Sequence, residues 1–374
     1  VPQVLLLCEY PTLNGGEQSM LATLAGVQAA GWRVSVLAPA HGPLAETLAA
    51  CSIPHLPFDT RASDGSRLGQ AALREKLAEV LRARRPDLLH ANSLAMGRLS
   101  GPIARELGIP SLSHLRDIIG LSRQAIEDLN AHTRLLAVSY ATRNYHVAQG
   151  LPAEKTHVLY NGIDLNKFCP RAATGYLHRE FGIPREAPII GTIGQVGLRK
   201  GQDTLFFAAA LGTLKSPLPH YLIVGERNSD KAESVEFERH LHTIATEQLP
   251  GRIHFLGRRT DVPSLLHELT LLVHPARQEP LGRVLLEAAA SGVPIVATDV
   301  GGTAEILPPD ANAARLVPAG DPTALAAAMR ALLDNAPLRQ TLATNARRRI
   351  EARFSIDLAL AGLLKHYKDV LTLQ

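Results

Sequence analysis

Two glutamates, Glu279 and Glu287, are the residues of this 374-residue chain whose types and spacing point most directly to chemistry. Glu287 has only apolar neighbours on either side, in a predicted helix over Gly282–Ser291 that looks buried nearly all round. A carboxylate there must be paired or hydrogen-bonded, either by Arg283 one turn back or by the hydroxyls of a ligand. Glu279 lies in the loop before the same helix. This helix start is therefore predicted to bind a polyhydroxylated, phosphate-bearing ligand.

A second candidate loop carries two adjacent cations. Residues 194–201 read GQVGLRKG, and they lie between a predicted strand and a predicted helix. Arg199 and Lys200 place positive charge beside the positive end of that helix, which suits a pyrophosphate. A solvated basic loop is the alternative. The glycine spacing differs from the G-x-G-x-x-G fingerprint, which counts against an NAD site.

Strand ends in the first half of the chain hold further candidates. His114 ends a predicted strand and either contacts a ligand or is a hydrogen-bonded structural histidine. His90 ends the preceding strand and is expected to be structural or to line an acceptor site. Arg116 is expected to hold an acidic acceptor or to pair with Asp117.

Glycines and one arginine mark other turns at strand ends. Gly16 precedes a predicted helix that begins at Glu17, where glycine permits close backbone approach and the helix start favours an anion. Gly225 and Arg258 end two strands of the second half, in loops of the kind that cradle a nucleotide base. Each of these turns has the plainer interpretation of an ordinary tight turn.

Short apolar strands alternate with helical stretches along the whole chain, which indicates parallel sheets covered by helices on both faces. One series occupies residues 1–165, a linker rich in Pro and Gly follows over 166–187, and a second series occupies 188–355. The fold class is therefore α/β, with two Rossmann-like domains facing a central cleft. Ligands are expected at the carboxyl ends of the strands.

The predicted strands are Val4–Cys8, Arg33–Ala38, Pro86–His90, Pro110–His114, Arg134–Ser139, Thr156–Tyr160, Ile189–Ile193, Tyr221–Val224, Ile253–Leu256, Leu271–His274 and Pro294–Thr298. The longer predicted helices are Glu17–Ala30, Pro43–Ala50, Leu68–Arg84, Gly97–Leu107, Gln202–Leu211, Glu233–Thr246, Gly282–Ser291, Pro322–Leu333, Pro337–Arg353 and Ile356–Leu371.

Composition narrows the class of protein. The chain is 46% hydrophobic and 20% charged, which is normal for a soluble globular protein. The net charge of +4 is spread along the chain, so a nucleic-acid partner is not expected, whereas anionic small molecules or a membrane surface remain as partners. Cys8, Cys51 and Cys169 form no metal or disulfide pattern, which favours a reducing cytoplasm. No signal peptide and no transmembrane run is predicted.

Several motifs together resemble a known family. Residues 279–282 (EPLG) and 287–302 (EAAASGVPIVATDVGG) resemble the E-x7-E signature of retaining glycosyltransferases with the GT-B fold, family GT4 (glycosyl transferases group 1). Other stretches agree in order and spacing, and the resemblance extends over essentially the whole chain. These stretches are Gly15–Glu17, Arg85–His90, His114, Ser139, Asn161–Asp164, Arg199–Gly201, Gly257–Pro263 and His274-Pro275.

The resemblance implies transfer of a sugar from a nucleoside-diphosphate sugar, with UDP as the default expectation, to a hydroxyl of a glycan, glycolipid or small molecule. Glu279 would bind hydroxyls of the donor sugar and support positive charge near its anomeric carbon. Glu287 would bind the ribose. Lys200 and Arg199 would hold the diphosphate and stabilise the leaving group. His114 would contact the donor sugar or the acceptor hydroxyl.

Further positions carry implied binding roles. Leu281, Gly282 and Arg283 would offer backbone amides to the diphosphate, Gly16 would line the donor phosphate or the acceptor, and Gly225 and Arg258 would lie at the nucleoside. The catalytic set implied is thus Glu279, His114 and Lys200.

The resemblance also implies a mechanism without a resident metal or cofactor. Anomeric configuration would be retained by a front-face route in which the leaving phosphate takes the acceptor proton, so no carboxylate nucleophile is proposed. The chain departs from the family pattern at Gln195, where many relatives have Arg, and at Ala276 and Leu281, where Ser and Phe are common. None of these changes removes a key charge.

Location and rival functions complete the expectations. The protein is expected in the cytoplasm, with weak peripheral contact to the inner face of the membrane as an option, although the helix ending at Arg84 is better explained as solvated. The last segment, 356–374, is expected to pack on the first domain, as in relatives. The rivals are a sugar-nucleotide epimerase or hydrolase with the same fold, and a non-catalytic nucleotide-sugar-binding protein.

Overall fold

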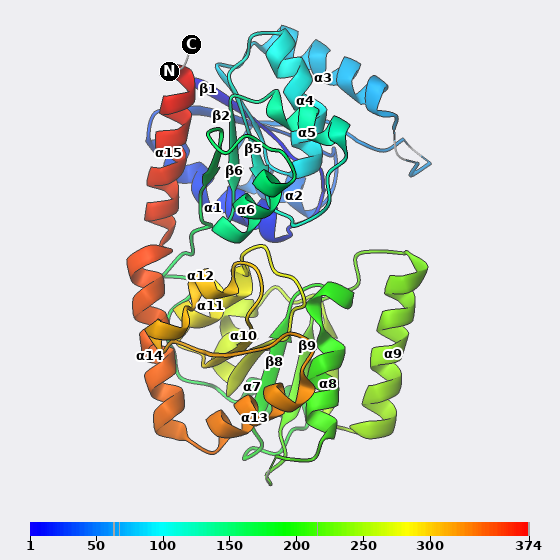
Figure 1. The fold of residues 1–374 in the computed structure, drawn as a ribbon, viewed down its shortest axis with the longest axis vertical. Helices are drawn as coiled ribbons and strands as arrows, with labels where there is room; N and C mark the ends of the chain where they lie inside the picture. The colour runs from blue at the N-terminus through cyan, green and yellow to red at the C-terminus, as the bar shows by residue number, and fades with distance from the viewer. Residues whose placement is uncertain (63, 67, 215, 373–374) are drawn as a thin grey trace. The chain divides into compact units, whose positions relative to one another are not determined.

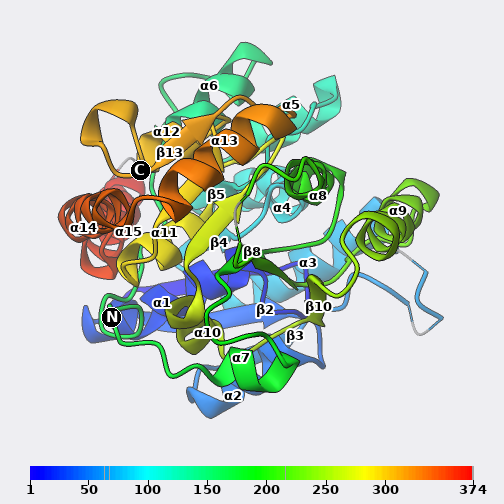
Figure 2. The same cartoon turned by 90° about the horizontal axis from the view of Figure 1, so that it is seen from below.

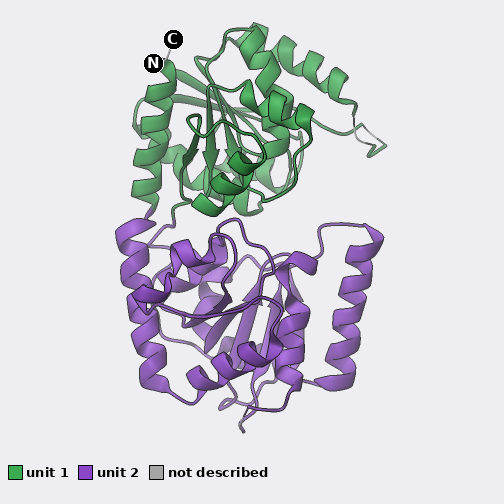
Figure 3. Cartoon of the chain, viewed as in Figure 1, with its two compact units in different colours: residues 1–162, 356–374 green, residues 163–355 purple. Residues whose placement is uncertain are grey.

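The computed structural model describes residues 1–62, 64–66, 68–214 and 216–372, which form two compact units (Figures 1 and 3). The first domain comprises Val1–Gly162 and the C-terminal segment that begins at Ile356, and the second domain comprises Ile163–Ser355. Each domain is built on one parallel sheet with helices on both faces. The predicted α/β class with two Rossmann-like domains is confirmed.

The first domain contains a seven-stranded sheet with the order β3-β2-β1-β4-β5-β6-β7. Every strand pair is parallel, so all carboxyl ends meet at one edge. The strands are β1 (Gln3–Leu7), β2 (Arg33–Ala38), β3 (His55–Pro57), β4 (Leu88–Ala91), β5 (Ser111–Leu115), β6 (Arg134–Ala137) and β7 (Thr156–Val158). The helices are α1 (Gly15–Ala29), α2 (Pro43–Ala50), α3 (Gln70–Arg84), α4 (Leu94–Glu106), α5 (Arg123–Asn130), α6 (Tyr140–Ala148) and α15 (Ile356–Thr372).

Strand β1 shows why this sheet is covered on both faces. Val4 and Leu6 pack in a buried cluster with residues of α1, α2 and α15, whereas Leu5 and Leu7 pack with residues of α3 and α4. Successive side chains of a strand point to opposite faces, so a continuous apolar run requires helices on both sides.

The C-terminal helix α15 belongs to the first domain. Gly26 of α1 lets the two helices approach closely, because a Cβ there would lie 2.2 Å from a methyl carbon of Leu360. Tyr367 and Val370 are fully buried in the same cluster as β1 and β2. Of the predicted segment 356–374, residues 373 and 374 lie outside the described residues.

The second domain contains a six-stranded parallel sheet with the order β10-β9-β8-β11-β12-β13. Its strands are β8 (Ile189–Ile193), β9 (His220–Val224), β10 (Ile253–Gly257), β11 (Leu271–His274), β12 (Ile295–Thr298) and β13 (Arg315–Val317). Its helical segments are α7 (Tyr176–Phe181), η1 (Leu198–Lys200), α8 (Gln202–Ala210), α9 (Ala232–Gln248), α10 (Val262–Glu268), α11 (Arg283–Ala290), α12 (Thr303–Ile306), η2 (Pro309–Ala311), α13 (Pro322–Leu333) and α14 (Ala336–Arg353).

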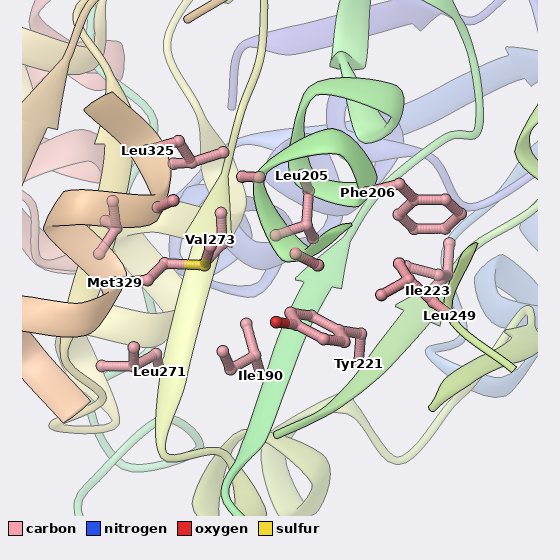
Figure 4. Close-up of a cluster of buried hydrophobic side chains, with 14 of the residues drawn as sticks. Ile190, Leu205, Phe206, Tyr221, Ile223, Leu249, Leu271, Val273, Leu325 and Met329 are labelled. Atoms are coloured by element: carbon pink, nitrogen blue, oxygen red, sulfur yellow. The ribbon is translucent and has the colours of Figure 1, made fainter. Parts of the chain in front are cut away.

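Helices α8, α9 and α13 cover one face of this second sheet (Figure 2). Their apolar side chains form a core with Ile190, Tyr221 and Val273 from three adjacent strands, and with Leu325 and Met329 from α13 (Figure 4). This core fixes the strands and so fixes the loops at their carboxyl ends.

The helices and strands predicted from the sequence are present. The structure also contains several short elements that were not predicted. The missed strands β3 and β13 have three residues each and lie at sheet edges, and the missed helices α5, α10 and α12 have eight residues or fewer. The predicted helix over Gly97–Leu107 begins earlier, at Leu94, because the Ser93 hydroxyl accepts a hydrogen bond from the Met96 amide and caps it.

Candidate active site

The predicted residues of the second domain lie in loops at the carboxyl edge of its sheet. Lys200 and Arg199 follow β8, Gly225 follows β9, and Arg258 follows β10. Glu279 follows β11, in the loop that leads to α11. The parallel topology therefore collects at one edge residues that are as far apart in the chain as Arg199 and Glu279.

Backbone contacts lock the loop before α11 against the loop after β8. The Arg277 amide donates to the Arg199 carbonyl at 2.8 Å, and the Arg277 guanidinium donates to Asp203 at 2.7 Å. Gly201 has φ +64°, and a Cβ there would lie 2.1 Å from the Pro275 carbonyl oxygen. Only glycine permits this approach. The two loops thus form one rigid support for Lys200.

A glycine in the loop after β12 packs against the backbone of Glu279. Gly301 has φ +53°, and a Cβ there would lie 1.9 Å from the Glu279 carbonyl oxygen. The next amide, of Gly302, donates to that same oxygen at 2.9 Å. Gly301 and Gly302, which follow β12, therefore position Glu279. This explains in physical terms why the 287–302 motif ends in two glycines.

Glu279 is 5% exposed, and its side chain is held by two partners. Its Oε2 accepts hydrogen bonds from Lys200 Nζ at 2.5 Å and from His274 Nε2 at 2.8 Å. Burial alone would raise the pKa of this carboxyl, but the Lys200 charge and the His274 hydrogen bond outweigh it and hold the pKa far below its ordinary value. Glu279 is therefore a carboxylate at neutral pH.

One oxygen of Glu279 remains available to a ligand. Both contacts above go to Oε2, and among the described residues Oε1 has no hydrogen-bond partner. A carboxylate oxygen accepts hydrogen bonds and cannot donate them. The site is thus suited to a ligand hydroxyl rather than to a ligand carboxylate or phosphate at this atom.

Glu287 lies on α11 and pairs with Arg283 one turn earlier. Arg283 Nε donates to Glu287 Oε1 at 2.8 Å, so the arginine partly satisfies the buried carboxylate. Burial nevertheless outweighs the arginine and raises the pKa of Glu287. Its Oε2 has no hydrogen-bond partner within the described parts of the chain. The carboxylate thus keeps one oxygen for a ligand. Pairing with Arg283 and binding of ligand hydroxyls, the two explanations that the sequence offered for a buried Glu287, are therefore compatible.

The other predicted donor-site residues are more exposed. Arg199 is exposed, unlike the half-buried Lys200 beside it. Arg258 is also exposed, and its amide donates to Glu226 Oε1 at 3.2 Å. Gly225 has φ +133°, and a Cβ there would lie 2.0 Å from the Gly194 carbonyl oxygen, so the turn requires glycine.

Helix α11 presents its N-terminus at the same edge. It begins at Arg283, directly after Leu281 and Gly282, and Gly282 has the left-handed φ of +101°. The first amides of any helix lack intrahelical acceptors and carry the positive end of the helix dipole. The predicted amide donors are therefore placed where they can bind an anion beside Lys200.

In the first domain, the structure gathers His90, His114 and Arg116 at the carboxyl ends of β4 and β5. They line a small cavity of about 30 Å³ together with residues of α1 and α15. Arg116 donates to the Asn92 side chain at 2.8 Å and to the Asn161 side chain at 3.0 Å. Two of the groups that accept hydrogen bonds from this guanidinium are therefore the side-chain amide oxygens of asparagines.

His114 itself is 4% exposed and bonded to a second histidine. Its Nδ1 lies 2.7 Å from His90 Nε2, and His90 Nδ1 lies 2.7 Å from the Tyr367 hydroxyl. Burial, aided by the nearby Arg116 charge, lowers the pKa of both histidines, to about 3 for His90. Gly16 lies against Arg116, since a Cβ there would be 3.1 Å from Arg116 Cδ.

The sequence pattern predicted no role for three residues of these clusters. His274 had a weak signal, since it ends β11 directly before the Glu279 loop. Asn92 likewise follows the end of β4. Tyr367 had none, because 277 residues separate it from His90.

Within the described residues, no group of three or more His, Cys, Asp or Glu side chains is arranged to hold a metal ion. Among those same residues, no helix combines the length and the apolar character needed to cross a bilayer.

Comparisons with known proteins agree with this geometry. The family model described as Glycosyl transferases group 1 matches residues 176–349, and the model described as Glycosyltransferase Family 4 matches residues 13–167. Anabaena HepE, solved in complex with UDP and glucose, superposes with a TM-score of 0.87 at 25% identity, covering 98% of this chain and all of that one, 100%.

Two curated relatives add to this picture. A GDP-mannose-dependent alpha-mannosyltransferase of Mycobacterium tuberculosis is 27% identical over 96% of this chain and 94% of its own length. A D-inositol 3-phosphate glycosyltransferase of Salinispora arenicola is 32% identical over 58% of this chain, and the match spans half of that relative, 50%. With both domains matched by family models, the chain belongs to the family 4 glycosyltransferases and has the GT-B fold.

Proposed function

We propose that this protein is a retaining glycosyltransferase that moves a sugar from a UDP-sugar to an acceptor hydroxyl without a resident metal. The family and the use of a sugar nucleotide follow from the matches above. The stereochemistry, the nucleotide and the absence of a metal requirement are the proposed part. The acceptor is a glycan, a glycolipid or a small molecule that presents a hydroxyl.

The observation that carries the proposal is the Glu279 carboxylate, held by Lys200 and His274 and with one oxygen open to a ligand. That oxygen suits a sugar hydroxyl, and its negative charge favours positive charge that develops near the anomeric carbon. Lys200 and the N-terminus of α11 offer the complementary positive groups for a diphosphate. Arg199 is exposed and free to add to them.

Protein cations and helix amides take the place of a metal in this proposal. As the bond to the diphosphate breaks, negative charge grows on the leaving phosphate, and Lys200 stabilises it. The acceptor attacks from the same face, and the leaving phosphate takes its proton. Glu279 is ionised but already bonded to two partners, so it acts as an electrostatic support and not as a proton donor.

Two observations favour different nucleotides. The whole-chain likeness to HepE, solved with UDP and glucose, favours UDP. The relative that is GDP-mannose-dependent, matched over 96% of this chain, favours GDP as the second candidate. Glu287 and the loops at Gly225 and Arg258 are the proposed nucleoside contacts in either case.

The first experiment is a thermal-shift screen of UDP, GDP and ADP and of their common sugar conjugates, because a ligand that binds the folded state raises the melting temperature. UDP-sugars are expected to raise it most. A larger shift with GDP-sugars would replace UDP by GDP, and no shift with any of them would overturn the donor assignment.

The second experiment follows the reaction with the bound donor and a panel of hydroxyl acceptors. Proton NMR of the first product reports its anomeric configuration, and retention is expected, with equal rates after EDTA treatment. Inversion would contradict the mechanism, and loss of rate with EDTA would contradict metal independence. Release of free sugar or an epimer with every acceptor would favour the hydrolase or epimerase, and binding without turnover would favour a non-catalytic binder.

A further inference from the structure

The C-terminal helix reaches the first-domain cavity through an uninterrupted chain of hydrogen bonds. Tyr367 on α15 contacts His90 on β4, and His90 contacts His114 on β5, each over 2.7 Å. The rings are also in aromatic contact, with centroids 5.6 Å apart for Tyr367 and His90 and 4.8 Å apart for the two histidines. All three side chains are buried. A chain of this kind has a direction, because each link needs one donor and one acceptor.

The hydroxyl of Tyr367 sets that direction. Its side chain is fully buried, and among the described residues the hydroxyl has no hydrogen-bond partner other than His90 Nδ1. If His90 Nδ1 carried the proton, the hydroxyl hydrogen would be left buried without an acceptor, which is unfavourable. Tyr367 therefore donates to His90 Nδ1.

The next two links follow from the chemistry of neutral imidazole, in which one ring nitrogen donates and the other accepts. Since His90 Nδ1 accepts, His90 Nε2 carries the proton and donates to His114 Nδ1. Since His114 Nδ1 accepts, the proton of His114 is on Nε2. Within the described residues, this Nε2 has no partner, and His114 lines the cavity.

We propose that Tyr367 and His90 are positioning residues that fix His114 as a hydrogen-bond donor, through Nε2–H, to an oxygen of the bound substrate. The inference rests on the proposed function, because it takes His114 to contact the donor sugar or the acceptor. It narrows that role: a nitrogen that carries a proton can bind a sugar hydroxyl or phosphate oxygen, but it cannot accept the acceptor's proton. Proton removal is therefore left to the leaving phosphate.

The test reads the tautomer of His114 directly. Long-range ¹⁵N–¹H spectra of histidine-labelled protein distinguish Nδ1–H from Nε2–H, with His114 assigned by His114→Gln. Wild type is expected to show a single Nε2–H form. Tyr367→Phe keeps the ring but removes the donor, so a mixture with Nδ1–H is expected. An Nδ1–H form in wild type, or an unchanged spectrum in Tyr367→Phe, would overturn the proposal.

Two further variants distinguish an effect of hydrogen-bond direction from an effect of side-chain packing. His90→Gln places an amide where it can still donate to His114 Nδ1, so the Nε2–H form should persist, whereas His90→Leu should lose it. Tyr221→Phe is the matched control in the second domain, because the Tyr221 hydroxyl is buried without a partner among the described residues (Figure 4). It should change neither the spectrum nor the rate.

The kinetic arm uses UDP-glucose as the donor. Tyr367→Phe should lower kcat/KM about tenfold and His90→Gln about threefold or less, as expected for disturbing one hydrogen bond. A Tyr367→Phe enzyme as active as the Tyr221→Phe control would overturn the functional part. The spectra decide the tautomer even in a protein without transferase activity, so failure of this inference and failure of the proposed function are separate results.

Discussion

The two domains bury polar groups at the carboxyl edges of their sheets, but they neutralise those groups in different ways. In the second domain the buried groups are ions: Glu279 with Lys200, and Glu287 with Arg283. In the first domain the buried chain that ends at His114 is neutral. The second domain thus offers ionised pairs to its ligand, whereas in the first domain a neutral hydrogen-bonded chain determines which nitrogen of His114 donates.

This difference has an energetic consequence. Breaking a buried ion pair leaves one charge uncompensated and typically costs about 3–5 kcal/mol. Disturbing one neutral hydrogen bond typically costs about 1 kcal/mol. Variants at the ion pair should therefore affect both stability and rate strongly, whereas variants of the neutral chain should mainly affect which ring nitrogen of His114 carries the proton.

The largest effect is expected from Lys200→Ala. Removing a preorganised group that stabilises charge in the transition state typically lowers the rate by about 10²–10³-fold, and the same is expected for Glu279→Ala. Steady-state transfer assays with the bound donor measure this loss. Arg171→Ala, which removes an exposed cation of the same domain, is the control and should retain its rate. A Lys200→Ala enzyme with wild-type turnover would contradict the proposed site.

The next effect is on stability, through Glu279→Gln. This variant leaves Lys200 without its ionic partner, so the free energy of unfolding should fall by about 3 kcal/mol at pH 7. Chemical denaturation measures it. The folded-state pKa of Glu279 is lowered, so its stabilisation is complete above the unfolded pKa of about 4.3 and is lost as pH falls below that value. The difference in unfolding free energy between wild type and variant should therefore shrink below about pH 4.3. A difference that stays constant as pH falls would show that the ion pair contributes nothing to stability.

The stability that the neutral chain of Tyr367, His90 and His114 contributes should be lost at a higher pH than the stability that the Glu279–Lys200 ion pair contributes. The folded-state pKa of His90 is lowered to about 3, so the folded state binds fewer protons than the unfolded state. Stability from this group is complete above the unfolded pKa of about 6.5 and is lost as pH falls from there towards 3. Between pH 6 and 4, unfolding free energies of His90→Gln should fall less steeply than those of wild type, by up to about 1.4 kcal/mol per pH unit. Equal slopes would mean that His90 takes up no proton on unfolding.

The comparison also shows what the sequence could and could not predict. Glu279, Arg283 and Glu287 lie within nine residues, so the helix that carries Arg283 and Glu287, its burial and the preceding loop with Glu279 could be predicted from local pattern. The Lys200 loop could be predicted as a phosphate site, but not its contact with Glu279, which depends on how β8 and β11 pair. The fold class was predictable because short apolar strands that alternate with longer periodic helices repeat along the chain, and this repeat is a strong local signal.

The neutral chain could not be predicted for a physical reason. His90 and His114 each had a strand-end signal, but a buried histidine pair has no characteristic spacing. Tyr367 reaches them only because α15 packs on α1, where Gly26 leaves room for Leu360. Such a contact depends on tertiary packing across 277 residues. The edge strands β3 and β13 were missed because three residues are too few for a period to show.

A smaller effect than that of Lys200→Ala is expected from Arg283→Met, which keeps the apolar stem of the side chain but removes its charge. The pKa of Glu287 is already raised by burial, and loss of Arg283, which opposes that rise, should raise it further. The ionised fraction of Glu287 should then fall as pH is lowered. If Glu287 binds the ribose equally in ground and transition states, KM for the donor should rise about threefold to tenfold with kcat unchanged. The rise should grow as pH is lowered, because a protonated carboxyl offers a poorer acceptor to the ribose hydroxyls. Measuring KM and kcat as a function of pH tests the pair, and a change in kcat with KM unchanged would place Glu287 in the chemical step instead.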